Sequence, residues 1–550
     1  MILWLVGPSG SGKSTLGSIL AERRNGQFVD TDRIVEEKAK ESVDEIFRRQ
    51  GEEGFRKLEA EAIEELVRKV KFREQLVVGT GGGSVIDPRN RDLMRSSGLR
   101  IYLDVDSARA IQRLVHSEER PLLSQSDPME DWLRLRAERD EAYMDHDLLI
   151  DANGNPQEIV DAIVQKLHRF HTSSWKIDAK LDGVTSRIRA YRSPWSAIRA
   201  YRLATRLTRS FIITDSNLAH HYPELLKRLA GSKGVVRVVD PGEGGKSFSI
   251  VEQLVEEIAS HGISREDCIL GFGGGVITDL AGFVASIYMR GIRSFAMPTS
   301  LLAMVDASVG GKTAINASDV RNLVGTFSQP ERVLICPAFL RTLPQRELRS
   351  GLVESMKMGI VRSKVLSDLV QDALPDVLEG KIPMMVDEVI RMSIATKLDV
   401  IGEDVYDKNH RALLNFGHTF AHALEAAAPG VWTHGEAVAF GMIAVTKLAS
   451  SEDGGQSDKQ RKEWGERTEE IVKRVLPLTN PDGERPEVEE IIKKMQRDKK
   501  TKWFLVRFVI PVGKVGTGWM VRGGFSEESI PKAIEEAWKL IDDYHGRTLS

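Results

Sequence analysis

A glycine-rich segment at the start of the chain restricts the possible fold more than any other feature. The apolar run Ile2–Val6 leads directly into Gly7-Pro-Ser-Gly-Ser-Gly-Lys-Ser-Thr15, which fits the pattern G-x-x-x-x-G-K-S/T. Between a strand and a helix, such a loop turns backbone N–H groups toward phosphate oxygens, while Lys13 and Ser14 reach the outer phosphates and Mg²⁺. The pattern predicts an ATP-type nucleotide site in a parallel α/β domain. The residues expected around the phosphates are Gly7, Gly10, Ser11, Gly12, Lys13, Ser14 and Thr15.

Length and charge narrow the class of protein. The 550 residues predict about three or four packed units at roughly 100–200 residues per domain. With 77 Lys and Arg against 80 Asp and Glu, the chain is unlike a protein dedicated to nucleic acid or to a membrane surface. Cys268 and Cys336 lie in apolar runs and are expected to be buried free thiols, and no apolar run reaches the ~18 residues of a membrane helix. We expect a cytoplasmic protein without nucleic-acid or membrane partners.

Changes in sequence pattern divide the chain. Residues 1–168 alternate strand-like runs with helical patterns, which is typical of a parallel sheet with helices on both faces. Residues 169–174 are a predicted linker, the alternation resumes over 175–336, and long helical patterns dominate 337–550. The predicted fold class is α/β, with a P-loop domain, a second α/β domain and a mostly helical domain.

Local patterns add three expectations. Helical periodicity favours helices over Glu36–Gln50 and Glu52–Val70, and a possible hairpin begins at Trp175. Seven arginines lie between Arg187 and Arg209. We interpret them as a solvated helix face, and a surface for phosphate or RNA is the alternative.

Polar residues after the later strands of the first domain are candidates for binding a phosphate acceptor. Asp30 and Asp32 follow the strand-like run Gln27–Val29, so one carboxylate can organise magnesium-bound water while the other accepts a hydroxyl proton. A solvated turn is the competing interpretation. The other features are Phe55-Arg56-x-x-Glu59, the triple glycine Gly81–Gly83, Arg120 and Arg139.

These motifs follow the order of the shikimate kinases, and residues 1–168 resemble that family. The resemblance implies transfer of phosphate from ATP, with Mg²⁺, to the 3-hydroxyl of shikimate. It also implies that Asp32 accepts the hydroxyl proton, that Asp30 supports magnesium, and that Arg120, on a lid over residues 115–126, stabilises charge on the transferred group. The residues implied for shikimate are Asp32, Arg56, Gly81, Gly82 and Arg139. The chain has Glu141-Ala-Tyr143 where the family usually has Pro-Leu-Tyr.

A second glycine-rich turn, Gly271-Phe-Gly-Gly-Gly-Val-Ile-Thr-Asp279, lies between a strand and a helix pattern. Its amides suit a pyrophosphate, although the spacing departs from G-x-G-x-x-G at the third glycine. Other strand-like runs end in polar residues that would reach a ribose, and an ordinary turn competes as the explanation for each. These residues are Asp215, Asn217, Glu243 and Lys246.

Histidines in the helical part indicate a metal site. His418 and His422 are four residues apart on one helical face, and His434 follows twelve residues later. Imidazole nitrogens with one carboxylate and an open position suit catalytic zinc. The spacing alone does not choose among the three histidines, and histidines satisfied by hydrogen bonds are the competing interpretation.

Residues 175–550 carry these motifs in the order of the 3-dehydroquinate synthases and resemble that family. The resemblance implies that 3-deoxy-D-arabino-heptulosonate 7-phosphate is cyclised to 3-dehydroquinate and phosphate, with NAD⁺ and with Zn²⁺ or Co²⁺ on Glu354, His418 and His434. The family usually has lysine where this chain has Arg321, which keeps the charge but changes the donor geometry.

The same resemblance assigns the remaining residues. It gives catalytic roles to Lys357, Arg411, Asn415 and His422, with His422 as a proton carrier, and it takes Arg290 from a neighbouring subunit. Residues implied for NAD⁺ are Asp215, Asn217, Glu243, Lys246, Gly273, Gly274, Gly275, Asp279, Thr299, Ser300, Asp306, Lys312, Arg321 and Thr342. Residues implied for the heptulosonate phosphate are Arg290, Asp306, Lys312, Asn322, Lys357, Lys397, Arg411, Asn415, His422, Lys499 and Lys500.

The leading hypothesis is a bifunctional enzyme of chorismate and aromatic amino acid biosynthesis that dimerises through its synthase half. One alternative makes the C-terminal half another sugar-phosphate cyclase or a metal-dependent alcohol dehydrogenase. The substrates of simple dehydrogenases carry no phosphate group, so the cations Lys312, Lys357 and Arg411 argue against this alternative. Another alternative makes the N-terminal half a nucleotide-binding regulatory module, against which the intact Lys13 and Asp32 argue.

Overall fold

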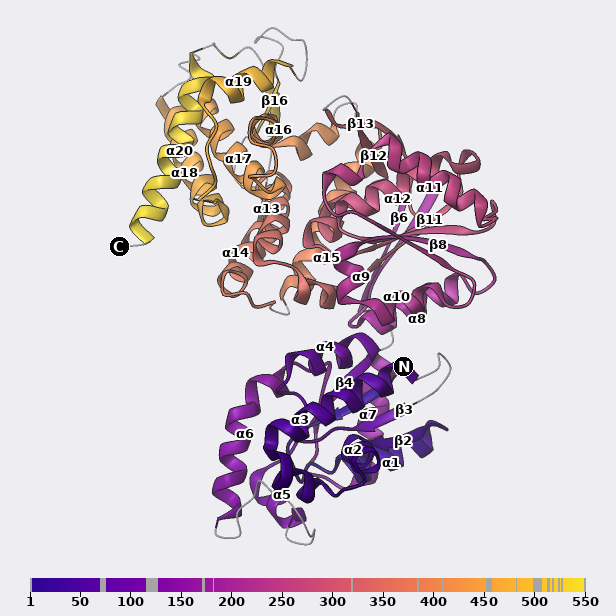
Figure 1. Ribbon diagram of the computed structural model, residues 1–550. Coiled ribbons are helices and arrows are strands. Elements are labelled where there is room, and N and C mark those ends of the chain that lie inside the picture. Colours follow the sequence, from indigo (N-terminus) through magenta and orange to yellow (C-terminus); the bar gives the residue numbers. More distant parts are fainter. Residues whose placement is uncertain are drawn as a thin grey trace. The chain divides into compact units, whose positions relative to one another are not determined.

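The computed structural model forms two compact units (Figure 1). Unit 1 comprises residues 1–174, 191–204 and 217–233, and unit 2 comprises the remainder of the chain. No helix of the described part is both long and apolar enough to cross a membrane. The structure describes residues 2–69, 76–114, 127–170, 174–181, 183–317, 320–382, 385–406, 410–451, 458–480, 482–497, 507–511, 515–516, 519–522, 525 and 528–548.

Unit 1 contains a five-stranded parallel sheet, as predicted (Figure 1). The strand order is β2-β3-β1-β4-β5, and every residue of the central strand β1 is buried. The ends of β1 and β3 therefore lie side by side, with Leu5 opposite Gly79. The strands are β1 (Ile2–Val6), β2 (Gln27–Asp30), β3 (Leu76–Gly79), β4 (Gly98–Asp104) and β5 (Leu148–Asp151).

Of the two helices predicted for unit 1, the one over Glu52–Val70 agrees with the second part of α3. The helix expected over Glu36–Gln50 is wrong, because Lys40 takes a left-handed conformation with φ 56° and ends α2 there. The chain restarts as α3, which is broken at Gly51 by a non-helical φ of 69°. The helices are α1 (Lys13–Arg23), α2 (Thr31–Ala39), α3 (Val43–Lys69), α4 (Pro88–Ser97), α5 (Ser107–Leu114), α6 (Pro128–Met144), α7 (Pro156–Phe170), α8 (Pro194–Ala204) and α10 (Pro223–Ala230); α9 (Ser216–His221) begins in unit 2.

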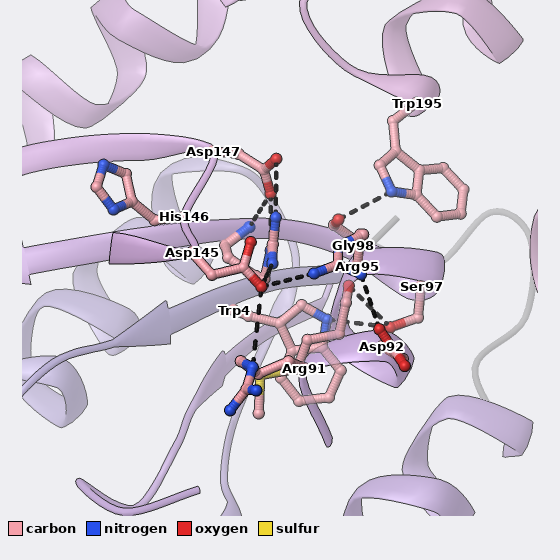
Figure 2. A network of polar contacts seen from close by, with 12 residues as sticks. Trp4, Arg91, Asp92, Arg95, Ser97, Gly98, Asp145, His146, Asp147 and Trp195 are labelled. Carbon is pink, nitrogen blue, oxygen red and sulfur yellow. Dashed lines mark hydrogen bonds and ion pairs between the residues drawn. The ribbon is translucent and has the colours of Figure 1, made fainter. Parts of the chain in front are cut away.

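A buried ion-pair network ties β4 to the residues before β5 (Figure 2). Arg100 is 1% exposed, and its guanidinium pairs with Asp145 (2.8 Å) and Asp147 (3.1 Å). Two indoles hold the start of β4: Trp4 Nε1 donates to Ser97 Oγ (3.1 Å), and Trp195 Nε1 of α8 donates to the carbonyl oxygen of Gly98 (2.9 Å). Helix α8 is thus anchored to the sheet of unit 1, although it follows the predicted linker in the sequence.

Unit 2 is built on a seven-stranded sheet with the order β6-β7-β14-β11-β10-β8-β9 (Figure 1). The hairpin expected at Trp175 is confirmed as the antiparallel pair β6–β7, and the other pairings in this sheet are parallel. The strands are β6 (Trp175–Leu181), β7 (Val184–Ala190), β8 (Ser210–Asp215), β9 (Val235–Val239), β10 (Cys268–Gly273), β11 (Arg293–Pro298) and β14 (Arg332–Ile335), with two ribbons, β12 (Lys312–Ala317) with β13 (Val320–Phe327) and β15 (Phe508–Pro511) with β16 (Trp519–Arg522).

Helices make up most of the C-terminal part of unit 2, as the sequence predicts. Helix α12 packs on β10 and β11, and further along the chain α17 packs against both α13 and α16. Cys268 and Cys336 are buried and form no disulfide, as expected. The helices are α11 (Phe248–Ser260), α12 (Gly275–Ile287), α13 (Gln345–Arg362), α14 (Lys364–Leu378), α15 (Met385–Glu403), α16 (His418–Ala427), α17 (His434–Ser451), α18 (Asp458–Val475), α19 (Val488–Arg497) and α20 (Ser529–Thr548), with short helical turns over 243–245, 288–290, 303–307, 337–342, 410–415 and 476–478.

The arginines between Arg187 and Arg209 do not form one helix face. Arg189 lies on β7 and pairs with Asp178 of β6 (2.6 Å). Arg202 lies on α8 and donates to carbonyl oxygens at the end of α10. These two arginines hold neighbouring elements together, which corrects the interpretation as a single solvated face.

We predict that Arg100→Met destabilises unit 1 by about 3–5 kcal/mol, because Asp145 and Asp147 lose the buried cation that offsets their desolvation. Hydrogen exchange of β1 and β4 peptides, measured by mass spectrometry in increasing urea, reports this loss. Arg134→Met is the control, since Arg134 forms its ion pairs on the surface and is 56% exposed. Equal protection in Arg100→Met and the wild type would contradict the prediction.

Candidate functional site

The P-loop of unit 1 connects β1 to α1. Gly10 has a φ of 82°, which favours glycine, and a Cβ at this residue would lie 2.6 Å from the carbonyl oxygen of Ala110. Lys13 Nζ donates to the carbonyl oxygens of Gly7 (2.8 Å) and Pro8 (2.9 Å). The ammonium group therefore lies over its own loop, where phosphate oxygens would replace these carbonyls.

Side chains from later in the chain brace the P-loop. Trp132 Nε1 of α6 donates to the carbonyl oxygen of Ser9 (2.9 Å), and Arg113 Nη1 of α5 donates to that of Gly10 (3.2 Å). Neither residue was predicted, because nothing in the pattern of an amphipathic helix identifies a side chain that bonds a distant loop.

The two groups proposed for magnesium lie together. Ser14 Oγ donates to Asp30 Oδ2 (2.9 Å) at the junction of β2 and α2. The other oxygen of Asp30 caps α2 by accepting from the backbone N–H of Asp32 (3.1 Å). A hydroxyl and a carboxylate at hydrogen-bond distance beside a phosphate-binding loop are suitable groups for a hydrated Mg²⁺.

The triple glycine Gly81–Gly83 gathers the charged residues expected around the phosphate acceptor. A Cβ on the first glycine would lie 2.9 Å from Asp32 Oδ1, and one on the second would lie 3.5 Å from Arg139 Nη1. The guanidinium of Arg56 fills the space beside the third. The structure therefore brings these three charged residues to one loop, whereas Arg120 and residues 115–126 lie outside the described residues.

Two residues of this pocket were absent from the predicted set. Glu59 is fully buried and accepts hydrogen bonds from Arg56 Nη1 (2.8 Å) and from the hydroxyl of Ser84. Tyr143 donates its hydroxyl to the carbonyl oxygen of Gly82 (2.5 Å), and burial raises the pKa of this phenol to about 12, which keeps it a donor. The available signals were the spacing of Glu59 from Arg56 and the tyrosine of the segment 141–143.

In unit 2 the second glycine-rich turn connects β10 to α12. Gly273 ends β10, where a Cβ would lie 2.6 Å from Ile277, so this glycine lets the helix approach the strand closely. A Cβ on Gly274 would lie 3.5 Å from Ser300 Oγ, and the N–H of Thr299 donates to the carbonyl oxygen of Gly273 (3.0 Å). The turn thus faces the end of the neighbouring strand β11, as a pyrophosphate site requires.

Lys246 connects the turn to the ribbon β12–β13. Its buried ammonium donates to Asp279 Oδ2 (2.7 Å) and to Asn322 Oδ1 (2.5 Å). Burial raises the pKa of Asp279 to about 6, and the charge of Lys246 opposes this rise. Glu243 accepts from Asn316 Nδ2 of the same ribbon (2.9 Å). Two residues from the predicted NAD set, Lys246 and Asp279, therefore contact each other directly.

Cations gather around Asp306. Lys397 Nζ lies 2.8 Å from Asp306 Oδ1, and the guanidinium of Arg411 donates to the carbonyl oxygen of Gly310 (3.2 Å). Burial by itself raises the pKa of Asp306, but Lys397 and then Lys357 outweigh it and hold this pKa below its usual range. Burial lowers the pKa of Lys397. Positive charge therefore acts on the carboxylate of Asp306 from more than one side chain.

The other residues predicted for NAD⁺ and the heptulosonate phosphate are spread over several elements. Asp215 ends β8, Asn217 belongs to unit 1, and Thr342 donates its hydroxyl to the carbonyl oxygen of Phe339 (3.2 Å). The exposed residues are Lys312 at the start of β12, Arg290 in the turn after α12, and Asn415 before α16. Lys499 and Lys500 lie outside the described residues.

Three groups that suit a metal ion converge from three helices. Glu354 of α13, His418 at the start of α16 and His434 at the start of α17 each offer one atom, and these atoms lie within 4.8 Å of one another. Nε2 of His418 lies 3.8 Å and Nε2 of His434 lies 3.6 Å from Glu354 Oε1. This buried oxygen has no hydrogen-bond partner among the described residues, while the other carboxylate oxygen accepts from Lys357. Two imidazoles and an unsatisfied carboxylate oxygen fit a divalent transition metal.

His422 lies beside this cluster rather than in it. Its exposed ring is 5.4 Å from that of His418, measured between ring centres. Burial, followed by the charge of Lys357, lowers the pKa of His418 well below its usual value, which favours the neutral imidazole that metals bind. Burial also acts to lower the pKa of His434, but the hydrogen bond and charge of Glu425 outweigh it and raise this pKa.

Arg321 and Glu425 meet beside the cluster. Arg321 Nη1 of β13 donates to Glu425 Oε1, and the other oxygen of Glu425 lies 3.4 Å from Nδ1 of His434. Arg321 had been assigned to NAD⁺ by resemblance, and Glu425 had not been assigned. The only available signal for Glu425 was its place two turns after His418 on the same helix.

Known proteins match both halves of the chain. Residues 9–168 match the family model of shikimate kinase, residues 236–350 match that of the 3-dehydroquinate synthase N-terminal domain, and residues 351–501 match that of its C-terminal domain. The bifunctional shikimate kinase/3-dehydroquinate synthase of Thermotoga maritima is 31% identical over 517 residues, which are 94% of this chain and 97% of the relative.

Two further similarities concern the C-terminal half. The 3-dehydroquinate synthase of Salinibacter ruber is 40% identical over 306 residues, which are 55% of this chain and 81% of the relative. The structure of ValA, a 2-epi-5-epi-valiolone synthase from Streptomyces hygroscopicus with NAD⁺ and Zn²⁺ bound, is similar with a TM-score of 0.52 and 26% identity, over 67% of this chain and 100% of that one.

We predict that Asp279 titrates near pH 6 in the folded protein, well above a free aspartate. Carbon-13 NMR of the labelled carboxyl, assigned with Asp279→Asn, measures this directly. Between roughly pH 4 and 6 the folded chain holds a proton that the unfolded chain lacks, so this group makes the free energy of unfolding fall as the pH rises. Lys246→Met is expected to raise the pKa of Asp279 further, and a pKa near 4 in the wild type would contradict the prediction.

Proposed function

The chain belongs to the family of bifunctional shikimate kinase/3-dehydroquinate synthases, and from this premise we propose how its residues perform the two reactions. It phosphorylates shikimate with ATP and converts 3-deoxy-D-arabino-heptulosonate 7-phosphate into 3-dehydroquinate and phosphate, two steps of aromatic amino acid biosynthesis. The observation that carries the proposal for the synthase is the convergence of His418 and His434 on the unsatisfied oxygen of Glu354. For the kinase it is the convergence of Asp32, Arg56 and Arg139 on the triple glycine beside a P-loop.

In the kinase site, the P-loop amides and Lys13 bind the phosphates of ATP. Ser14 and Asp30, already linked by a 2.9 Å hydrogen bond, would hold a hydrated Mg²⁺. Arg120 is the residue proposed to neutralise charge on the transferred phosphoryl group. The other ATP contacts are Gly7, Gly10, Ser11, Gly12 and Thr15.

Shikimate binds along the triple glycine. Arg56 and Arg139 offer planar donor groups to its carboxylate, and Glu59 holds the guanidinium of Arg56 at the required angle. The backbone of Gly81 and Gly82 permits close approach of the ring. Asp32, next to the first glycine, accepts the proton of the attacking hydroxyl.

In the synthase site, the glycine-rich turn Gly273–Gly275 would hold NAD⁺. Lys246 and Asp279 support the nucleotide from the side of the ribbon, and Ser300 faces Gly274. When bound, NAD⁺ accepts and returns a hydride at the alcohol carbon of the substrate, and the divalent metal, Zn²⁺ or Co²⁺, polarises that alcohol. The other residues proposed for NAD⁺ are Asp215, Asn217, Glu243, Thr299, Asp306, Lys312, Arg321 and Thr342.

Cationic side chains hold the anionic substrate. Lys357 and Lys397, which act on Asp306, and Arg411, which acts on Lys397, neutralise the phosphate and carboxylate and stabilise the leaving phosphate. His422 is exposed beside the metal cluster, and its ring moves protons to and from the substrate during elimination and ring closure. The other proposed contacts are Arg290, Lys312, Asn322, Asn415, Lys499 and Lys500.

We further propose a cytoplasmic homodimer that forms through the synthase half. Arg290 supports this arrangement, because it lies exposed in the turn after α12, where a residue of a second subunit can reach it. We also propose residues 169–174 as the linker between the kinase domain, 1–168, and the synthase domains, 175–336 and 337–550.

We predict that Asp32→Asn lowers kcat of the kinase by roughly 10²-fold or more, because the amide cannot accept the hydroxyl proton. ATP affinity, measured by calorimetry, is expected to stay within about threefold of the wild-type value. The synthase rate of the same protein serves as the internal control. An unchanged kinase kcat would remove Asp32 from the mechanism.

We predict that His434→Ala loses the bound metal and the synthase activity but keeps the kinase activity in excess Mg²⁺. Metal content is measured by mass spectrometry after dialysis against dipicolinate. His422→Ala is the matched control, because it is expected to retain the metal while its synthase rate falls. Full metal occupancy in His434→Ala would refute the assignment of this ligand.

A further inference from the structure

The carboxylate of Glu425 lies between a cation and a candidate metal ligand. It is 3% exposed; its Oε1 accepts from Arg321, and its Oε2 lies 3.4 Å from Nδ1 of His434. We propose that Arg321 and Glu425 are positioning residues that fix the imidazole of His434 and thereby set the affinity of the synthase site for its metal. This inference rests on the metal site of the proposed function.

The two nitrogens of His434 have different surroundings. Nδ1 faces Glu425, and Nε2 lies 3.6 Å from the unsatisfied oxygen of Glu354. A neutral imidazole has one donor and one acceptor, and an ionised carboxylate only accepts. Nδ1 therefore carries the proton and donates to Glu425, while the lone pair of Nε2 is directed to the metal position.

His418 has the same arrangement with a weaker acceptor. Its Nδ1 lies 3.3 Å from the carbonyl oxygen of Phe416, and its Nε2 lies 3.8 Å from Glu354 Oε1. Both rings therefore turn Nε2 toward the same carboxylate oxygen. Within the described part of the chain, the ring nitrogen Nδ1 of His434 has a charged partner and that of His418 has a backbone carbonyl. A charged acceptor raises the basicity of the ligand more than a backbone carbonyl does.

Arg321 explains how Glu425 remains ionised where it is. A nearly fully buried carboxylate needs a cation and hydrogen bonds to offset its desolvation. Arg321, on strand β13 of the ribbon, supplies the cation and a hydrogen bond. Because its own side chain is 41% exposed, its charge is desolvated much less than that of Glu425. A guanidinium also has a rigid planar donor group, which restricts the angle of the carboxylate more than an ammonium group does.

The central experiment compares Co²⁺ binding to the metal-free full-length chain and to Glu425→Gln, followed by the visible absorption of bound Co²⁺. The variant keeps the size and an acceptor oxygen but loses the charge, so Co²⁺ affinity is expected to fall by roughly 10- to 100-fold. Glu388→Gln is the matched control, because Glu388 belongs to an ion pair with Arg391 on α15 away from the cluster. Its Co²⁺ affinity is expected to equal that of the wild type.

Variants of Arg321 test the second member of the pair. Arg321→Lys keeps the charge and is expected to bind Co²⁺ within about threefold of the wild type, whereas Arg321→Ala is expected to bind more weakly than Arg321→Lys. Because Arg321 acts through Glu425, its removal in the Glu425→Gln background is expected to cause little further loss. Additive losses would show that Arg321 affects the metal by another route and would overturn the pairing.

A spectroscopic measurement separates positioning from a general structural role. In the NMR spectrum of the protein labelled with nitrogen-15 histidine, we expect a proton on Nδ1 of His434. Glu425→Gln is expected to weaken the hydrogen bond of this proton and to leave the signals of His418 unchanged. If folded Glu425→Gln binds Co²⁺ as the wild type does, the inference is wrong and the metal site stands. If the wild type binds no divalent ion, the proposed metal site itself is wrong.

Discussion

The burial of Glu354 is the constraint on which the synthase site depends. Its carboxylate is fully buried, and among the residues that the structure describes only Lys357, on the next turn of the same helix, satisfies one of its oxygens. Leaving the other oxygen without a hydrogen bond costs on the order of 1–3 kcal/mol or more. The fold sustains this cost only because α13, α16 and α17 pack closely enough for His418 and His434 to surround that oxygen. The chemistry of the site therefore depends directly on how these three helices pack.

In the kinase site, backbone groups rather than buried side chains provide most of the nucleotide-binding loop. Its nucleotide loop relies on amides and on Gly10, so most of the site is encoded by residues that are adjacent in the sequence. The acceptor side instead needs Arg56 held by the buried carboxylate of Glu59, a pairing within one helix. Both halves thus place a buried carboxylate behind a working side chain. In the kinase it orients a cation, and in the synthase Glu425 orients a histidine.

This difference explains what the sequence could predict. The P-loop, the parallel sheets and the hairpin at Trp175 follow from local patterns of glycine and apolar residues, and they agree with the structure. The end of α2 at Lys40 was missed, because a left-handed lysine leaves no sign in the periodicity. Trp132 and Glu425 were missed for another reason: their partners are Ser9 and His434, and only the tertiary fold brings each pair together. Spacing likewise could not separate His422 from the other two histidines.

The ribbon β12–β13 shows how one irregular element can serve two parts of a site. Arg321 and Asn322 are consecutive, yet Arg321 contacts Glu425 beside the metal cluster, while Asn322 accepts from Lys246 beside the glycine-rich turn. Successive side chains of a strand point to opposite faces of the sheet. At Asn322 the backbone also departs from the regular strand conformation, because its φ is 54°. Any shift of this ribbon would move both contacts at once. The ribbon therefore links the glycine-rich turn to the candidate metal cluster through two adjacent residues.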